Sequence, residues 1–133
     1  MPSPTSIAYV PVAIDDTVES GYASSLGVAA VACAADADPE AALPLLESLV
    51  ARGSDLDAAG VVELADAQVD GAGDCVNQGT FAWWTRQATE RALAGALPDG
   101  QPLGGVPSIY VGDRLYSGDV ADPAAFAAFV TEG

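Results

Sequence analysis

The sequence has neither histidine nor lysine among its 133 residues. Without histidine it cannot build a Ser-His-Asp triad, a Cys-His pair or a His-ligated zinc site. We therefore predict no metal site and no cofactor. Nineteen acidic residues stand against four basic ones, all arginine, and the resulting net charge of −15 repels phosphate groups, which argues against a nucleic-acid partner.

Long apolar runs are also missing. No stretch approaches the roughly 20 residues that a membrane-spanning helix needs, and the first residues, MPSPTS, lack the basic and apolar regions of an export signal. We predict no membrane span in this chain. The length is enough for one domain with one core, and its many alanines give thin packing for each buried position.

Cysteine is scarce: the sequence has two, Cys33 and Cys75. It contains no Cys-X-X-Cys. The residues alone leave several states open. The two thiols can be bonded to each other, or be buried separately as small apolar side chains. A redox-active pair is disfavoured, because no positive charge adjoins either cysteine and Asp74 lies next to Cys75.

The first hundred residues are predicted to be largely helical after one strand. Residues 7–14, IAYVPVAI, have a β-type composition, and Pro11 favours an edge strand or a bulge. Ser20 or Ser24 is a candidate N-cap for the first helix, and Asp38-Pro39 for the second. Helical patterns cover 22–35, 38–52, 54–67 and 80–97, with an irregular piece at 69–79. The apolar stripe of Phe81, Trp84, Ala88 and Leu93 indicates a core-facing helix.

The tail returns to strands. Residues 107–111 and 115–117 are two apolar runs around Gly112-Asp113, which is a hairpin signal. Asp122-Pro123 then opens a final amphipathic helix. Pro107 has two explanations at this point: an ordinary trans proline opening a strand, or a cis proline, since X-Pro bonds adopt cis at a cost of about 0.5–1 kcal/mol.

Residues 104–130, GGVPSIYVGDRLYSGDVADPAAFAAFV, resemble the end of a DsbA-like thioredoxin fold, a family of disulfide oxidoreductases. Weaker matches upstream are YVPVAIDD, YASSLGVAAVACAAD and GDCVNQGTFAWW. The resemblance implies an α/β (α+β) thioredoxin-like fold that lacks its first strand and its Cys-X-X-Cys helix. It also implies one incomplete domain over 1–133, with a strand at 7–14, a helical insertion at 20–98, and a cis-proline hairpin and last helix at 104–133.

The same resemblance implies site residues. The Val106–Pro107 bond is expected to be cis and to present Val106 and Pro107 to an extended polypeptide substrate or partner protein. Trp83, Trp84 or Tyr110 could form apolar walls beside it. Cys33 and Cys75 are expected to form a structural disulfide, worth about 3–4 kcal/mol through loop closure, and the setting is expected to be extracytoplasmic.

Three functions compete. The first is a DsbA-like thiol-disulfide oxidoreductase domain for exported proteins that lacks its catalytic Cys-X-X-Cys and is inactive alone. The second is a redox-inactive binding module that docks a partner at the cis-proline groove or at an open sheet edge, through which two copies could also pair. The third is an unrelated small acidic α+β domain. No catalytic residue is assigned in any of them.

Overall fold

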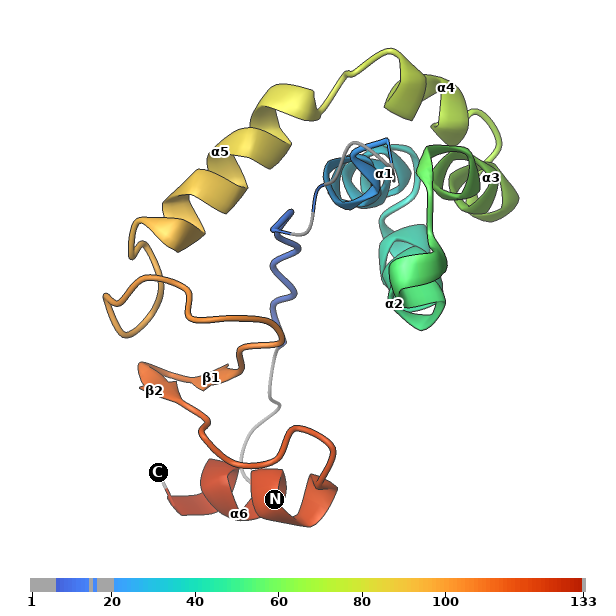
Figure 1. The fold of residues 1–133 in the computed structure, drawn as a ribbon. Coiled ribbons are helices and arrows are strands. Elements are labelled where there is room, and N and C mark those ends of the chain that lie inside the picture. The colour runs from blue at the N-terminus through green and yellow to red at the C-terminus, as the bar shows by residue number, and fades with distance from the viewer. Residues whose placement is uncertain (1–6, 15, 17–20, 133) are drawn as a thin grey trace. The chain divides into compact units, whose positions relative to one another are not determined.

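The structure is a computed structural model that describes residues 7–14, 16 and 21–132 (Figure 1). Its contacts divide the chain into two compact units, Met1–Thr89 and Glu90–Gly133. The division falls inside helix α5 (Ala82–Leu93). It therefore lies before residue 98, where the sequence predicts the helical insertion of a single domain to end.

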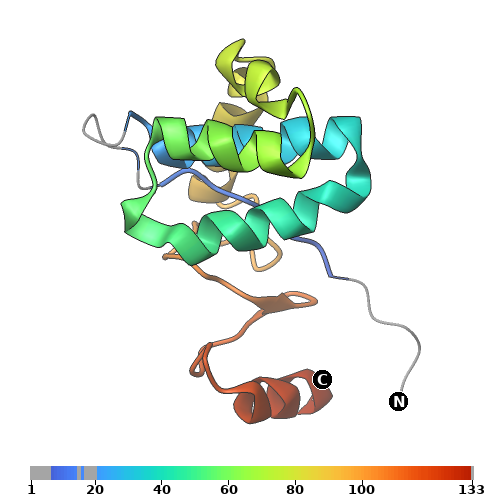
Figure 2. The same ribbon diagram turned by 90° about the vertical axis from the view of Figure 1, so that its right-hand side faces the viewer.

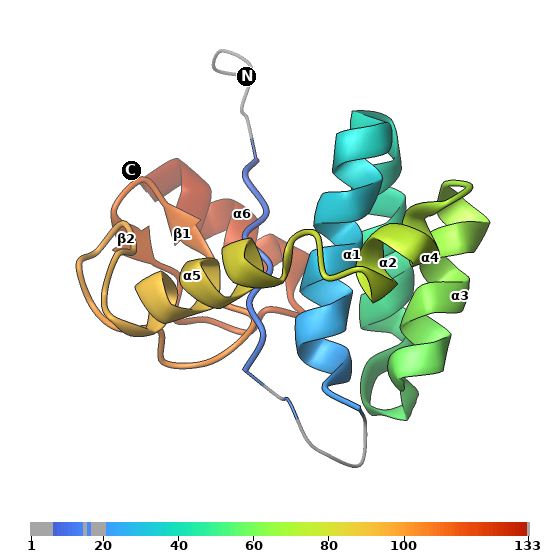
Figure 3. The ribbon, with the colours of Figure 1, turned by 90° about the horizontal axis from the view of Figure 1, so that it is seen from above.

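The first unit is helical. Helix α1 packs against α2, α3 and α4, and α3 packs against both α2 and α4. Figure 3 shows these four helices grouped together. The helical elements are α1 (Ala23–Ala37), the 3-10 turn η1 (Pro39–Ala41), α2 (Ala42–Arg52), the 3-10 turn η2 (Gly53–Asp55), α3 (Ala58–Gln68), α4 (Ala72–Asn77) and the start of α5.

Proline and glycine set the limits of α2 as the sequence predicts. Asp38 accepts a hydrogen bond from the Glu40 amide at 3.1 Å, and Pro39 follows it at the first helical position. Pro44 lies in the first turn of α2, where a missing N–H removes no helical hydrogen bond. Gly53 ends the helix with a φ of 56°, a left-handed value that suits glycine.

Helix α1 begins differently from the prediction. Tyr22 occupies the N-cap position with a left-handed φ of 61° and makes no side-chain cap. The carboxylate of Asp16 instead accepts hydrogen bonds from the backbone N–H, at 2.8 Å, and the hydroxyl of Ser25. Ser24 is therefore not the cap, and Ser20 lies outside the described residues.

The segment predicted to be irregular contains helix α4. Gly71, with a φ of 86°, turns the chain into this helix, and Asp66 of α3 accepts a hydrogen bond from the Gly73 amide in its first turn. At the other end of the insertion, α5 stops at Leu93 instead of residue 97, because Gly95 adopts a left-handed φ of 96°.

The predicted strand over residues 7–14 is not observed. These residues form no regular secondary structure, and they pass between α1 and α5 (Figure 3). A strand needs a hydrogen-bonded neighbour, and in the part of the chain that the structure describes the only sheet pairs two other strands. Pro11 lacks an N–H, and the Ala13 amide donates to Thr89 Oγ1 at 3.0 Å.

The core of the first unit is rich in alanine. Among the residues that the structure describes, only Leu45 and Val61 are large side chains that are fully buried, at 0% exposure. The remaining buried members of this core are small or less completely buried: Ala23, Ala30, Cys33, Ala34, Ala41, Leu49, Ala65, Ala72 and Val76. Each large side chain therefore fills a disproportionate share of the interior.

The second unit holds the predicted hairpin and last helix. Strands β1 (Tyr110–Val111) and β2 (Arg114–Leu115) pair antiparallel, and Gly112 in the turn between them has a φ of 62°. Helix α6 (Pro123–Glu132) is capped as predicted by Asp122, which accepts hydrogen bonds from two amides of the first turn at 3.0 and 3.2 Å.

Aromatic contacts join the hairpin to α6. The Tyr116 ring lies 5.3 Å from the rings of both Phe126 and Phe129. The Arg114 guanidinium lies 4.4 Å from the Phe129 ring and donates to the Phe129 carbonyl at 3.2 Å. Figure 2 shows β1–β2 and α6 in the same orange-to-red part of the ribbon. None of the residues of α6, all of which are described, is buried.

The helices of both units are short. Among the described residues, no helix combines the length and the hydrophobicity that crossing a bilayer requires.

Candidate functional site

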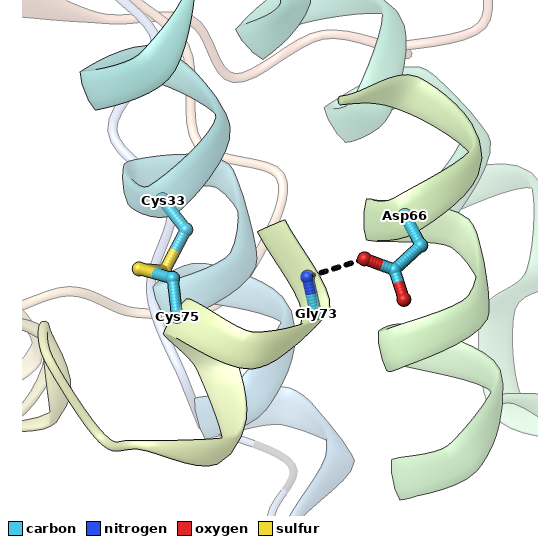
Figure 4. The surroundings of a disulfide bond; sticks show 4 residues. All are labelled: Cys33, Asp66, Gly73 and Cys75. Carbon is cyan, nitrogen blue, oxygen red and sulfur yellow. Dashed lines mark hydrogen bonds between the residues drawn. A yellow bond between two sulfur atoms is a disulfide. The ribbon is translucent and has the colours of Figure 1, made fainter. Parts of the chain in front are cut away.

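The two cysteines form a disulfide, as the resemblance implies. Cys33 on α1 and Cys75 on α4 are 42 positions apart in sequence and have Cα atoms 6.0 Å apart (Figure 4). Cys33 is buried and Cys75 is half-buried. The bond fastens the short helix α4 to the central helix of the first unit.

A hydrogen bond holds the other side of α4. Asp66 Oδ1, on α3, accepts from the Gly73 amide at 2.8 Å, on the side of α4 away from Cys75 in Figure 4. A carboxylate at the start of a helix satisfies a free N–H and interacts favourably with the helix dipole. The approach is close enough that a Cβ at position 73 would lie 2.5 Å from Asp66 Oδ2, so a side chain here would push the Asp66 carboxylate away from the Gly73 amide.

Replacing Asp66 by alanine is expected to destabilise the chain by about 1–2 kcal/mol, the usual cost of losing a helix-capping side chain. The reason is that the Gly73 amide loses its acceptor. Urea denaturation of the oxidised protein measures the change. Asp66→Asn keeps an acceptor oxygen and is the control, expected to retain most of the stability. Equal loss in both variants would mean that the negative charge, and not the hydrogen bond, stabilises α4.

Val106 and Pro107 lie at the surface of the second unit. Val106 is 51% exposed, Pro107 is also exposed, and the peptide bond between them is cis. Ser108 donates its hydroxyl hydrogen to the Gly105 carbonyl at 2.6 Å, which closes a tight turn around the proline. Within the described residues, no hydrogen bond involves the backbone of Val106.

Two phenols lie near this turn in sequence and are neutral. Burial raises the pKa of Tyr116 above its usual value, and the carboxylates of Asp122 and Asp119 raise it further. Burial also raises the pKa of Tyr110, with an added effect from Asp99. The Tyr116 hydroxyl donates to the Asp119 carbonyl at 2.9 Å, a bond that requires the protonated phenol.

The structure groups the predicted site residues in two places. The disulfide and the two tryptophans belong to the first unit, and Val106, Pro107 and Tyr110 belong to the second. Among the described residues, no group of three Cys, Asp or Glu side chains is placed to hold a metal ion. The chain can thus present backbone at Val106, but its sequence holds no Cys-X-X-Cys to attack a disulfide.

The fold of this chain is similar to that of a solved structure, the reduced form of a disulfide bond oxidoreductase (DsbG) from Mycobacterium tuberculosis. The TM-score is 0.65 and the sequence identity is 26%, and the match covers 93% of this chain but 59% of that chain. No protein-family model and no curated protein matches the sequence significantly. The mostly helical fold with its small two-stranded sheet is therefore similar to that of a disulfide oxidoreductase.

The apolar stripe on α5, predicted to face the core, borders instead on an apolar groove in the first unit. Ala88 of that stripe is buried, but Trp84 is 40% and Leu93 is 50% exposed. Trp84 and Phe81 line the groove together with residues of α1 and α2. The adjacent pair Trp83-Trp84 on a helix was the available signal, since two large neighbouring side chains point about 100° apart and a narrow apolar stripe does not cover both.

Proposed function

We propose that this chain is a DsbA-like thiol-disulfide oxidoreductase domain for exported proteins that lacks the catalytic Cys-X-X-Cys and is inactive alone. The observation that carries the proposal is the likeness to a disulfide bond oxidoreductase over 93% of the chain. The chain spans 59% of that protein, so the activity of the whole protein is carried over here as a proposal. The cis bond at Val106–Pro107 is in keeping with it.

The role proposed for this chain is to hold an extended polypeptide. A strand-like peptide binds by pairing its backbone with free backbone groups, while its side chains occupy neighbouring pockets. The exposed Val106 and Pro107 are suited to this. Thiol-disulfide exchange begins with attack of a thiolate on a disulfide sulfur. The thiolate would have to come from a cysteine other than Cys33 and Cys75, which are bonded to each other.

Peptide docking is tested by NMR titration of the isotopically labelled chain with reduced, alkylated insulin B chain. We expect the amide resonances of Val106 and Ser108 to shift, because the peptide backbone pairs beside Pro107. In the matched activity assay, reduction of insulin by dithiothreitol, we expect the chain and its Cys33→Ser/Cys75→Ser variant to leave the rate unchanged.

Two outcomes contradict this proposal. Unchanged resonances at Val106 and Ser108 would show that the peptide does not bind beside Pro107. Faster insulin reduction by the unmodified chain that is lost in the double cysteine variant would make Cys33 and Cys75 a redox-active pair and not a structural one.

The alternative is a redox-inactive binding module, and the observation that favours it is the missing Cys-X-X-Cys. Its partner would occupy the Val106–Pro107 surface or the edge of the β1–β2 sheet. The upstream DNA separates the two functions. An in-phase reading frame that encodes a Cys-X-X-Cys supports the oxidoreductase, and its absence supports the binding module.

We also propose an extracytoplasmic setting. Disulfides persist in oxidising compartments and are rare in the reducing cytosol. The Cys33–Cys75 bond supports this location, and so does the likeness to a disulfide bond oxidoreductase.

A further inference from the structure

An apolar groove of about 580 Å³ lies within the first unit. The C-terminal half of α1, the start of α2, the start of α5 and the segment 7–14 form its walls. Its volume is within the range of about 300–1,000 Å³ that is typical of ligand sites. The lining residues are Tyr9, Pro11, Val31, Ala32, Ala35, Asp36, Pro39, Ala42, Leu43, Leu46, Phe81 and Trp84.

Several apolar side chains of the groove are exposed to solvent. Tyr9 is 55% exposed, and Leu43 and Trp84 are 40% exposed. Exposed apolar side chains at a concave site are features of surfaces that bind another protein.

One acidic side chain lies in the wall of the groove. Of the described residues that line it, only Asp36 is charged. It lies in the last turn of α1, a helix that has no basic residue in that turn. The carbonyl end of a helix carries partial negative charge, so Asp36 and the helix end reinforce each other. The aromatic faces of Tyr9 and Trp84 also attract cations.

We propose that this groove binds an apolar segment of another protein that carries lysine or arginine. The apolar side chains of that segment would cover Leu43, Leu46 and Trp84, and its cationic group would lie at Asp36. A second copy of this chain fits the groove poorly, because two chains that each carry a net charge of −15 repel each other. The site needs no thiol chemistry and is independent of the proposed function.

The two tryptophans of the chain, Trp83 and Trp84, provide the measurement. In a Trp83→Phe background, fluorescence reports Trp84 in the groove wall alone. The probe is a synthetic amphipathic helix of leucine and lysine, and its counterpart has glutamate at every lysine position. We expect a saturable blue shift with the lysine peptide, weaker binding as salt rises, and no shift with the glutamate peptide.

Two matched variants localise the binding. Leu43→Asn in the groove is expected to weaken binding of the lysine peptide about tenfold, the factor that corresponds to losing one apolar contact. Val50→Asn is the control, because Val50 is on the same helix, is 72% exposed and does not line the groove. Asp36→Asn is expected to weaken binding about threefold, as for an exposed ion pair.

Several outcomes would overturn the proposal. Equal affinity for the two peptides would show that binding needs no cationic group. Equal effects of Leu43→Asn and Val50→Asn would show that the peptide does not bind in the groove. Dodecyltrimethylammonium binding as tightly as the peptide would indicate a site for a small apolar cation. A fluorescence shift that follows chain concentration, together with dimer formation in sedimentation, would indicate a second copy. None of these results bears on the resonances of Val106 and Ser108, so the two proposals fail separately.

Discussion

Loss of the Cys33–Cys75 disulfide is expected to lower the free energy of unfolding by about 3–4 kcal/mol. In the chain-entropy model, a bond that closes a loop of this length removes about that much conformational freedom from the unfolded chain. The sequence separation is 42. Because whole domains are stable by only about 5–15 kcal/mol, the reduced protein is expected to be near the limit of folding.

The position of the bond increases its importance. It joins α1, the helix that packs on α2, α3 and α4, to a helix of only six residues. Such a short helix is unstable by itself. With the disulfide reduced, the Asp66–Gly73 hydrogen bond and the buried side chains Ala72 and Val76 remain to hold α4.

Urea denaturation of the oxidised protein, the reduced protein and the Cys33→Ser/Cys75→Ser variant measures the effect. We expect both disulfide-free forms to lose the same stability and their melting temperatures to fall by about 10–20 °C. Thiol labelling under denaturing conditions confirms the state of the cysteines in each sample. A loss below about 1 kcal/mol would contradict the prediction and would mean that the unfolded chain retains structure around this loop.

Leu45→Ala is expected to cost about 2–5 kcal/mol, the range for removing a fully buried leucine side chain. Leu45 on α2 is 0% exposed, and within the described part of the chain it shares complete burial of a large side chain with Val61 alone. The cost is expected in the upper part of the range. The neighbouring alanines have short side chains that cannot move into the cavity, so the lost contacts are not replaced.

The control for this variant is Val50→Ala on the same helix. Val50 is 72% exposed, so its truncation is expected to change stability by less than about 0.5 kcal/mol. Comparison within one helix separates cavity formation from any change in helix propensity. Similar losses in the two variants would mean that packing of Leu45 contributes no more to stability than the exposed Val50 does, since alanine favours the helix in both.

Local chemistry explains which elements could be predicted from the sequence. Asp38-Pro39 and Asp122-Pro123 each combine a capping carboxylate with a proline at the first helical position, and both start a helical element. Gly53 ends α2 as expected. These capping and stop signals depend only on residues adjacent in sequence, so the start and end of such a helix can be predicted without knowing the tertiary structure.

The features that were missed depend on distant residues. Helix α4 has glycines at its start, and its stabilising acceptor, Asp66, is on another helix. Residues 7–14 have a strand-like composition, but a strand also needs a partner, and composition does not supply one. For the same reason Trp84 was placed in the core. Its stripe is apolar, but what covers a stripe is decided by the tertiary packing.

The candidate sites divide in the same way. The two cysteines alone do not predict a disulfide, because two thiols in a sequence can equally stay unbonded. The Cys33–Cys75 pairing was predicted only through the family resemblance. Val106 is exposed, and its docking role stays a prediction. The groove combines four separate segments of the first unit, and no local pattern in the sequence brings them together.

Helix α6 is attached to the hairpin by the rings of Tyr116, Phe126 and Phe129 and by Arg114, and it buries none of its own residues. Detaching this helix would expose mainly the Tyr116 ring and the two phenylalanines that pack on it, whereas opening α1 would break the alanine-rich core of the first unit around the disulfide. Backbone amides that become accessible through such local openings exchange with solvent, and protease sites behave in the same way. Among the helices, α6 is thus expected to take up deuterium and to be cleaved first, while the helices around Cys33 stay closed until the whole first unit unfolds.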